Sequence, residues 1–312
     1  NRLISDHRMR HGAINAIEYE WVFNEIERKF GISRGILLAF WGFETDFGAV
    51  QGNFNTLNSL ITLAHDCRRP DLFRPQIFAA LELFERGSFE PAITEGAWAG
   101  EIGMVQMLPE DILIAGIDGD GDGVVDLKTS APDALMSAAN MLRSLGWRAN
   151  EDWMQEVLMP TNFDWALTGL EKEKTSLQWE KLGVRGLNDK TKSDNLSASI
   201  ILPQGRYGPA FMVFPNFKVL FEWNKSFVYV TTAAYFATLL EGGALIGNTN
   251  ADPGLNLDDM KALQKKLIAL GYDVGKIDGI LGAKTRVAVQ SIQNELGMPA
   301  DAWPTKMLLD RL

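Results

Sequence analysis

The chain has 312 residues, 46% of them hydrophobic and 22% charged, a composition typical of a globular protein with two or three domains. Its formal net charge of −10 argues against nucleic acid or an anionic membrane as a partner, because both attract basic patches. The single cysteine, Cys67, excludes an internal disulfide but does not identify a compartment. With three histidines and no HExxH motif or Cys/His cluster, a zinc enzyme is not expected.

The opening stretch NRLISDHRMRHG is polar and shows no signal-peptide pattern. Its sequence is typical of the interior of a domain, so we expect either a truncated chain or a disordered start. Residues 13–30 have the apolar spacing of one amphipathic helix, which Gly31 ends. The next helix is predicted to begin after an N-cap at Ser33 and to end with Gly48 as its C′ residue. Further helices are predicted at 55–66, 75–86, 106–115, 131–145 and 151–158.

The second half of the chain changes character at about residue 160. Residues 160–217 are richer in Pro and Gly and contain the β-favouring pieces SASIILP and AFMVFPNF, whereas helical spacing returns at 217–241. The uncharged segment 226–240 is shorter than the roughly 20 residues of a bilayer span, so no transmembrane segment is expected. Residues 257–312 form an amphipathic unit with the pattern of a small helical bundle. Its apolar positions are Met260, Leu263, Leu267, Leu270, Val287, Val289, Ile292 and Leu296.

The apolar stretch GILLAFWGFETDFGAV, residues 35–50, contains two acids. On a helical wheel Glu44 lies at the centre of an apolar arc, flanked by Phe40 and Phe47, whereas Asp46 lies on the opposite side, as a solvated or helix-end carboxylate would. Loss of hydration among aromatic rings would raise the pKa of Glu44 and keep it protonated near neutral pH, as a glycosidic general acid must be. A buried structural glutamate paired with an arginine is the alternative that periodicity leaves open.

The stretch GAWAGEIGMVQMLPED, residues 96–111, is rich in glycine. Gly96, Gly100 and Gly103 would let the backbone approach a ligand closely, and the alternative is a tight turn between helices. Gln106 offers a donor and an acceptor that could hold sugar hydroxyls or an N-acetyl group.

The stretch DGDGDGVVDLKTSAPD, residues 118–133, matches the start of an EF-hand loop. The predicted metal ligands are Asp118, Asp120, Asp122, the backbone carbonyl of Val124, Asp126 and Asp133. Position 12 is Thr129 instead of a bidentate glutamate, so a regulatory calcium sensor is not predicted, and Asp133 closes the shell in its place. Hard oxygen ligands favour Ca²⁺ in a structural role, and a solvated acidic turn is the alternative.

Four stretches, in this order, resemble the lytic murein transglycosylase B family: GFETDFG, GAWAGEIGMVQMLP, DGDGDGVVDLKTSAPDALMSAANMLRSLGW and FPNFKVLFEWNKSFVYV. The resemblance covers about residues 13–241 and implies a lysozyme-like fold that cleaves peptidoglycan, with Glu44 as the single catalytic acid/base. The substrate-binding residues that we predict are Arg68, Arg69, Gly103, Gln106, Asn224 and Tyr229. No organic cofactor is expected.

The chemistry implied by this family needs only one acid. Glu44 would protonate the bond between N-acetylmuramic acid and N-acetylglucosamine and then accept the proton of the muramyl C6 hydroxyl as that oxygen attacks C1. The product is a 1,6-anhydromuramyl end. Two other hypotheses stay open: a hydrolytic muramidase, for which Glu101 is the best second acid, and a non-catalytic wall-binding protein.

Residues 257–312 resemble the peptidoglycan-binding type 1 domain. The match rests on Leu263-Gln264, Leu267, Leu270-Gly271-Tyr272, Asp278-Gly279, Gly282, Thr285, Ala288-Val289 and Gln293, and a late Asp-Gly of the pattern is replaced by Asp301-Ala302. This resemblance implies anchoring to the cell wall.

The predicted fold is α+β and mostly helical. The predicted parts are a lysozyme-like catalytic domain at 1–158 and 217–246, a small β-containing subdomain at 159–216, a linker at 247–256 and a three-helix peptidoglycan-binding domain at 257–312. Expected partners are the glycan strands and peptide stems of peptidoglycan and other cell-wall enzymes. The expected location is the periplasm of a Gram-negative envelope.

Overall fold

The computed structural model describes residues 3–187, 196–244, 246 and 250–312. The chain divides into two compact units, the first Asn1–Asn150 with Thr232–Gly243 and the second Glu151–Thr231 with Ala244–Leu312. Among the described residues, no helix combines the length and the apolar character needed to cross a membrane. Part of the predicted linker, residues 247–249, lies outside the described residues.

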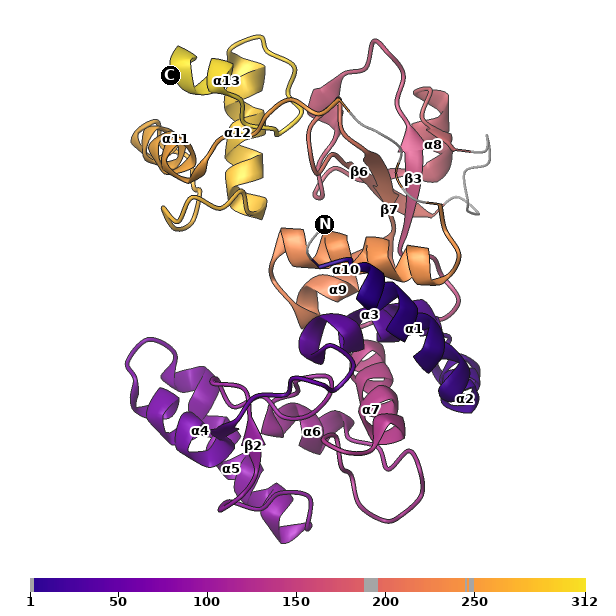
Figure 1. The fold of residues 1–312 in the computed structure, drawn as a ribbon. Helices are drawn as coiled ribbons and strands as arrows, with labels where there is room; N and C mark the ends of the chain where they lie inside the picture. The colour runs from indigo at the N-terminus through magenta and orange to yellow at the C-terminus, as the bar shows by residue number, and fades with distance from the viewer. Residues whose placement is uncertain (1–2, 188–195, 245, 247–249) are drawn as a thin grey trace. The chain divides into compact units, whose positions relative to one another are not determined.

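The first unit is mostly helical (Figure 1), and its helix α3, which packs against α1, α2 and α7, is largely buried. Its elements are α1 (Asp6–Glu18), α2 (Glu20–Phe30), α3 (Arg34–Thr45), β1 (Phe54–Asn55), α4 (Thr56–His65), α5 (Pro70–Glu85), β2 (Glu95–Gly96), α6 (Pro109–Ala115) and α7 (Ala131–Ser144). The Ser33 hydroxyl caps α3 by accepting from the Gly35 N–H at 3.1 Å, as predicted. Every residue from Gly35 to Gly42 is buried, so α3 forms part of the core.

Three helix predictions are wrong in detail. The helix predicted at 13–30 is two helices, because the chain leaves helical geometry at Tyr19 (φ −107°, ψ 26°). The segment 217–241 likewise divides into α9 (Pro215–Trp223) and α10 (Phe227–Leu240). Residues 151–158 contain strand β3 (Met154–Leu158) instead of a helix, since pairing with another strand overrides their local preference.

The second unit contains a five-stranded sheet in the order β4-β6-β7-β3-β5, with every neighbouring pair antiparallel. The strands other than β3 are β4 (Lys174–Thr175), β5 (Arg185–Gly186), β6 (Ser197–Ile201) and β7 (Ala210–Val213), accompanied by the short helices η1 (Trp165–Leu167) and α8 (Ser176–Lys181). Trp179 is fully buried in the core of this part and donates from Nε1 to the carbonyl of Ala198 at 2.9 Å. The β-favouring stretches of the sequence therefore form β7, the central strand, and its neighbour β6.

The same unit carries the predicted three-helix bundle, with α11 (Leu257–Ala269), α12 (Ala283–Glu295) and α13 (Lys306–Arg311). Two positions predicted in its core, Leu270 and Val287, are more than half exposed. Leu270 lies at the C-cap of α11, and Val287 lies outside the buried positions of α12, which are spaced as one helical face. The described part of the predicted linker is packed: the carbonyl of Asp252 accepts from Trp303 Nε1 at 2.9 Å.

Candidate active site

Glu44 lies in the last turn of α3, one residue before the helix ends at Thr45. Its side chain is partly exposed, unlike that of a structural glutamate in a core. The aromatic residues around this turn pack closely, with Trp41 and Phe47 in an edge-on contact at 5.6 Å between ring centroids. A carboxyl group at this position can meet a ligand from solvent while its helix is held by the core.

The chain turns sharply after Glu44. Asp46, Phe47 and Gly48 adopt positive φ angles of 53°, 60° and 87°, so the C-terminal turn is left-handed over three residues and not only at the predicted Gly48. Left-handed geometry at a residue other than glycine costs of the order of 1 kcal/mol or more. The surrounding contacts must therefore hold this turn in place.

Thr45 supplies one of those contacts and is 1% exposed. Its hydroxyl donates to the carbonyl of Met104 at 2.6 Å and accepts from the N–H of Gly48 at 2.9 Å. The hydroxyl thus joins the turn after Glu44 to the glycine-rich segment, 59 residues further along the chain.

Asp46 supplies the other contact. As the C-cap of α3, it accepts from Arg8 Nε at 3.0 Å, with His7 Nε2 at 3.6 Å. An acid at a helix C-terminus is unfavourable next to the exposed carbonyls, and the Arg8 cation compensates for it. The structure confirms the interpretation of Asp46 as a helix-end acid and places its partners on α1.

Gln106 lies in the glycine-rich segment with φ 55°. Its Nε2 donates to the carbonyls of Gly103 at 2.9 Å and Gln51 at 3.3 Å. Both amide protons are therefore used inside the protein, and only Oε1 is left to a ligand. The prediction that Gln106 offers both a donor and an acceptor is wrong on this point.

The glycines of this segment allow close internal packing. A β-carbon at Gly96 would clash with the carbonyl of Glu101, and one at Gly103 would clash with Leu127. Gly103 also has φ 81°, which favours glycine. The structure thus supports the interpretation as a tight turn, and the α-carbon of Gly103 faces the protein.

Arg68 and Arg69 lie between α4 and α5, and both are exposed. The Arg68 side chain is 79% exposed and forms a two-point contact with Asp66 at 2.9 Å. This contact lowers the pKa of the Asp66 carboxyl and raises that of Arg68. The guanidinium is thereby held by its neighbour while it stays open to solvent.

Asn224 and Tyr229 belong to the second unit. Asn224 is the C-cap of α9, and its Oδ1 accepts from the N–H of Ser226 at 2.9 Å. Tyr229 lies in the first turn of α10, where its N–H donates to the Ser226 hydroxyl at 3.3 Å. The turn between these helices therefore fixes the backbone at both predicted positions.

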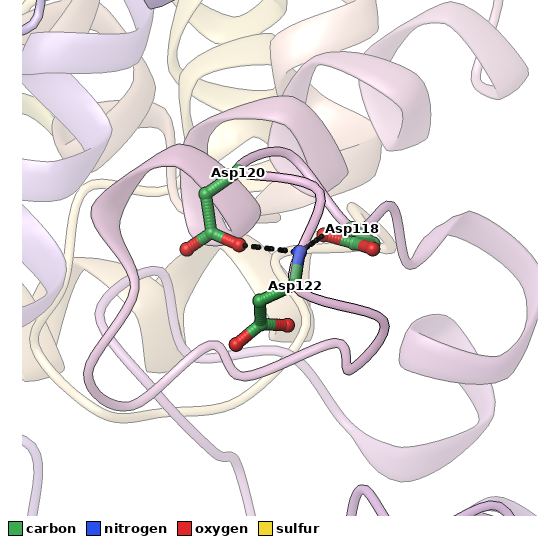
Figure 2. A group of neighbouring side chains, drawn as sticks. All are labelled: Asp118, Asp120 and Asp122. Carbon is green, nitrogen blue, oxygen red and sulfur yellow. Dashed lines mark hydrogen bonds between the residues drawn. The ribbon is translucent and has the colours of Figure 1, made fainter.

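Three of the predicted metal ligands gather in the acidic loop. Asp118, Asp120 and Asp122 each offer one carboxylate oxygen, and these oxygens lie within 4.8 Å of one another (Figure 2). Asp118 also accepts from the N–H of Gly121 at 2.7 Å and of Gly123 at 2.8 Å, so the loop is curled around its carboxylate. Three acids this close repel one another, and a cation would relieve the repulsion.

Asp126 and Asp133 lie outside this group of three carboxylates. Asp133 is 1% exposed, and its two oxygens accept from the N–H of Gly119 at 2.8 Å and of Asp126 at 2.7 Å. The acid predicted to close the metal shell thus ties the two ends of the loop together. Val124 is exposed at the loop tip.

Residues 1–238 match the transglycosylase SLT domain family, and residues 256–312 match a peptidoglycan binding domain. The crystal structure of SltB3 from Pseudomonas aeruginosa in complex with NAG-anhNAM-pentapeptide is 35% identical to this chain, with a TM-score of 0.89 over 99% of this chain and 84% of that chain. SltB3 in complex with NAG-NAM-pentapeptide gives the same values.

The membrane-bound lytic murein transglycosylase B of Escherichia coli (strain K12) is 26% identical over 231 residues. That alignment covers 73% of this chain, and the chain spans only 62% of this curated relative's length. Escherichia coli Slt35 in complex with calcium has a TM-score of 0.67 at 22% identity, over 77% of this chain and 76% of that chain, and thus shares the fold. These matches confirm the predicted α+β, lysozyme-like fold class and both resemblances: the chain belongs to the transglycosylase SLT domain family and carries a peptidoglycan-binding domain after it.

Proposed function

We propose that the protein is a peptidoglycan lytic transglycosylase, which cleaves the bond between N-acetylmuramic acid and N-acetylglucosamine and leaves 1,6-anhydromuramyl ends. The observation that carries the proposal is the position of Glu44, partly exposed at the end of a buried helix and followed by a fixed left-handed turn. Membership of the transglycosylase SLT domain family, over 238 residues of the chain, supports it.

The proposed mechanism uses Glu44 twice. As an acid, it protonates the glycosidic oxygen and the leaving sugar departs. As a carboxylate, it accepts the proton of the muramyl C6 hydroxyl while that oxygen bonds to C1, so no water is consumed. The neighbouring Asp46 is engaged by Arg8, which fits a reaction that needs no second carboxylate.

We further propose that Arg68, Arg69, Gln106, Asn224 and Tyr229 contact the substrate. Arg68 can reach a carboxylate or an acetamido oxygen from solvent, and Gln106 Oε1 can accept from an amide N–H or a hydroxyl of a sugar. Gly103 contributes its turn geometry, because its α-carbon is packed against the protein.

Ca²⁺ is the metal that we propose for the acidic loop. The support is the group formed by Asp118, Asp120 and Asp122, whose hard oxygens suit this ion. Its role would be structural, because Asp133, in the first turn of α7, accepts a hydrogen bond from the loop and so holds the loop against that helix.

The substrate also suggests where the protein works. SltB3 was crystallised with glycan fragments bearing a pentapeptide, so we propose that this chain meets both the glycan strands and the peptide stems of peptidoglycan. Its place would then be the periplasm or the cell envelope.

The test is mass spectrometry of the muropeptides released from purified sacculi. The wild-type protein should release 1,6-anhydromuramyl products, Glu44→Gln should release none, and Glu101→Gln, a matched change in the glycine-rich turn, should behave as wild type. Reducing ends, with activity lost in Glu101→Gln, would indicate a hydrolytic muramidase. Sacculus binding without any release would indicate a non-catalytic protein.

A further inference from the structure

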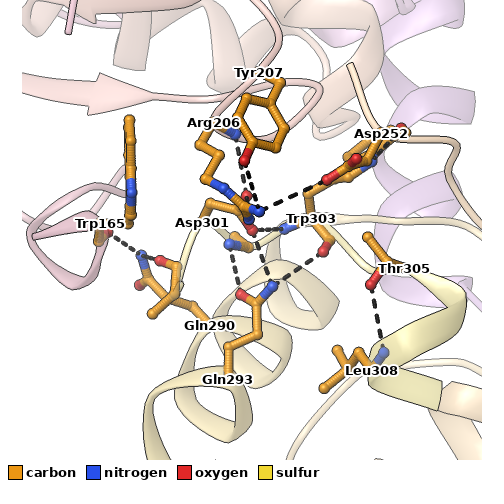
Figure 3. A network of polar contacts seen from close by, with 12 residues as sticks. Trp165, Arg206, Tyr207, Asp252, Gln290, Gln293, Asp301, Trp303, Thr305 and Leu308 are labelled. Atoms are coloured by element: carbon orange, nitrogen blue, oxygen red, sulfur yellow. Dashed lines mark hydrogen bonds and ion pairs between the residues drawn. The ribbon is translucent and has the colours of Figure 1, made fainter. Parts of the chain in front are cut away.

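The helical bundle packs against the strand-rich part of its own unit through a buried polar network (Figure 3). At its centre Gln290, 6% exposed, donates from Nε2 to the carbonyls of Trp165 at 3.2 Å and Thr168 at 2.8 Å. It donates further to the carbonyl of Ala300 at 3.0 Å, and its Oε1 accepts from Lys172 Nζ at 2.8 Å. One side chain therefore joins segments that are 118 to 125 residues apart in the chain.

A second set of contacts lies beside the first (Figure 3). Arg206 donates to Asp301 at 3.2 Å from its side chain and at 3.1 Å from its backbone N–H. Gln293 Nε2 donates to the other oxygen of Asp301 at 2.9 Å. Asp301 is 3% exposed, so both of its oxygens are satisfied within the protein.

A cavity of about 360 Å³ lies between these two parts of the unit. This volume is within the range of small-molecule sites. The apolar lining residues include Leu170, Ile201, Leu202, Phe227, Ala283 and Val287. The polar network around the cavity makes its walls a preformed part of the fold.

Arg286 is the notable polar group in the lining. Its guanidinium donates to the carbonyls of Leu202 at 3.2 Å and Pro203 at 2.8 Å and lies 4.4 Å from the centroid of the Phe227 ring. Within the part of the chain that the structure describes, Nε is buried with no acceptor and no carboxylate forms an ion pair with this cation. Burial lowers the pKa of Arg286 to about 10, so at neutral pH the group stays charged at a cost.

No other charged residue of the lining forms an ion pair with Arg286. Asp273 is paired with Lys284 at 2.7 Å, and Asp301 is held by Arg206. Glu171 is exposed to solvent. Arg286 is thus the cation of this cavity that has no ion pair of its own among the described residues: two carbonyls and the Phe227 ring contact its guanidinium, and the Asp301 carboxylate attracts it without pairing with it.

We propose that the cavity binds a carboxylate carried on a short aliphatic group, with the Arg286 guanidinium as its charge partner. The carboxylate would supply the counter-ion, and the apolar walls would cover the aliphatic part. The choice of source rests on the proposed function: in peptidoglycan this chemistry is the alanine carboxyl end of a peptide stem. Glu44 is not among the lining residues, all of which belong to the second unit.

The test is calorimetric titration of the full chain with the dipeptide D-alanyl-D-alanine, which has no glycosidic bond and thus reports on this site independently of cleavage. We expect saturable binding that weakens about tenfold or more when the carboxylate is replaced by an amide, the loss of one charge-assisted contact. Acetate should bind at least tenfold more weakly than the dipeptide, because it leaves the apolar walls uncovered.

Two variants localise the binding. Arg286→Gln should abolish it, and Val287→Trp, at a lining position that is 58% exposed, should block it without disturbing the core. Ile268→Trp, at an exposed position of α11 outside the lining, is the matched control and should bind as wild type. Equal affinity for dipeptide and amide, equal affinity for dipeptide and acetate, or unchanged binding by Val287→Trp would overturn the proposal, whatever the muropeptide assay shows.

Discussion

Thr45→Val tests whether the turn after Glu44 is held by a single hydroxyl. Valine keeps the shape of threonine but leaves the Met104 carbonyl and the Gly48 N–H without their partner. Each lost hydrogen bond costs about 1 kcal/mol, and an unsatisfied buried group adds about 1–3 kcal/mol. Because Thr45 is 1% exposed, we expect unfolding to become easier by about 2–4 kcal/mol.

The assay is urea denaturation, run beside the rate of anhydromuropeptide release. Thr62→Val is the matched control: its hydroxyl also donates to a backbone carbonyl, that of Asn58 at 2.7 Å, but it is exposed and should change stability by less than about 0.5 kcal/mol. The release rate should fall in Thr45→Val under conditions where the protein is still folded. If the two variants are equally stable and equally active, the hydroxyl does not hold the turn.

Three further outcomes are expected. Ala302→Gly should stabilise the protein by about 0.5–1 kcal/mol in urea denaturation, because Ala302 has φ 60°; a loss of stability would contradict this. Gln264→Leu should destabilise it by about 2–3 kcal/mol in the same assay, since the fully buried Gln264 accepts from the N–H of Gly279 at 2.8 Å; unchanged stability would refute that role. Ca²⁺ at a hundred times its Kd should stabilise the wild type by about 2.7 kcal/mol in thermal unfolding. The variants Asp118→Asn and Asp120→Asn should show no such gain, and an equal gain would place the ion elsewhere.

Local sequence signals predicted the helix that carries Glu44. The Ser33 cap, the length of the apolar run that follows it and Gly48 at its end together indicated a helix, and the wheel separated Glu44 from Asp46. The prediction of a helix at 151–158 was wrong because a short apolar segment fits a helix and a strand equally well. Pairing with β7, for example between Met154 and Val213, makes this segment a strand, and the sequence does not show that pairing.

The contacts that organise the site could not be read from the sequence. Arg8 meets Asp46 across 38 positions and Thr45 meets Met104 across 59, and neither pair follows a helical or strand spacing. The cavity around Arg286 could not be predicted either, because an isolated arginine in an amphipathic helix is normally interpreted as a solvated residue. Such partners are fixed by tertiary packing alone.

The polar network centred on Gln290 limits how the C-terminal helical bundle can be exchanged between proteins. A domain that is joined to the rest of its chain by a linker alone can be cut there and fused to another protein. Here Gln290 joins the bundle to Trp165 and Thr168, and Arg206 reaches Asp301. A transplanted bundle would bring half of a buried polar interface with it and leave the other half behind, so a working chimera must carry both halves.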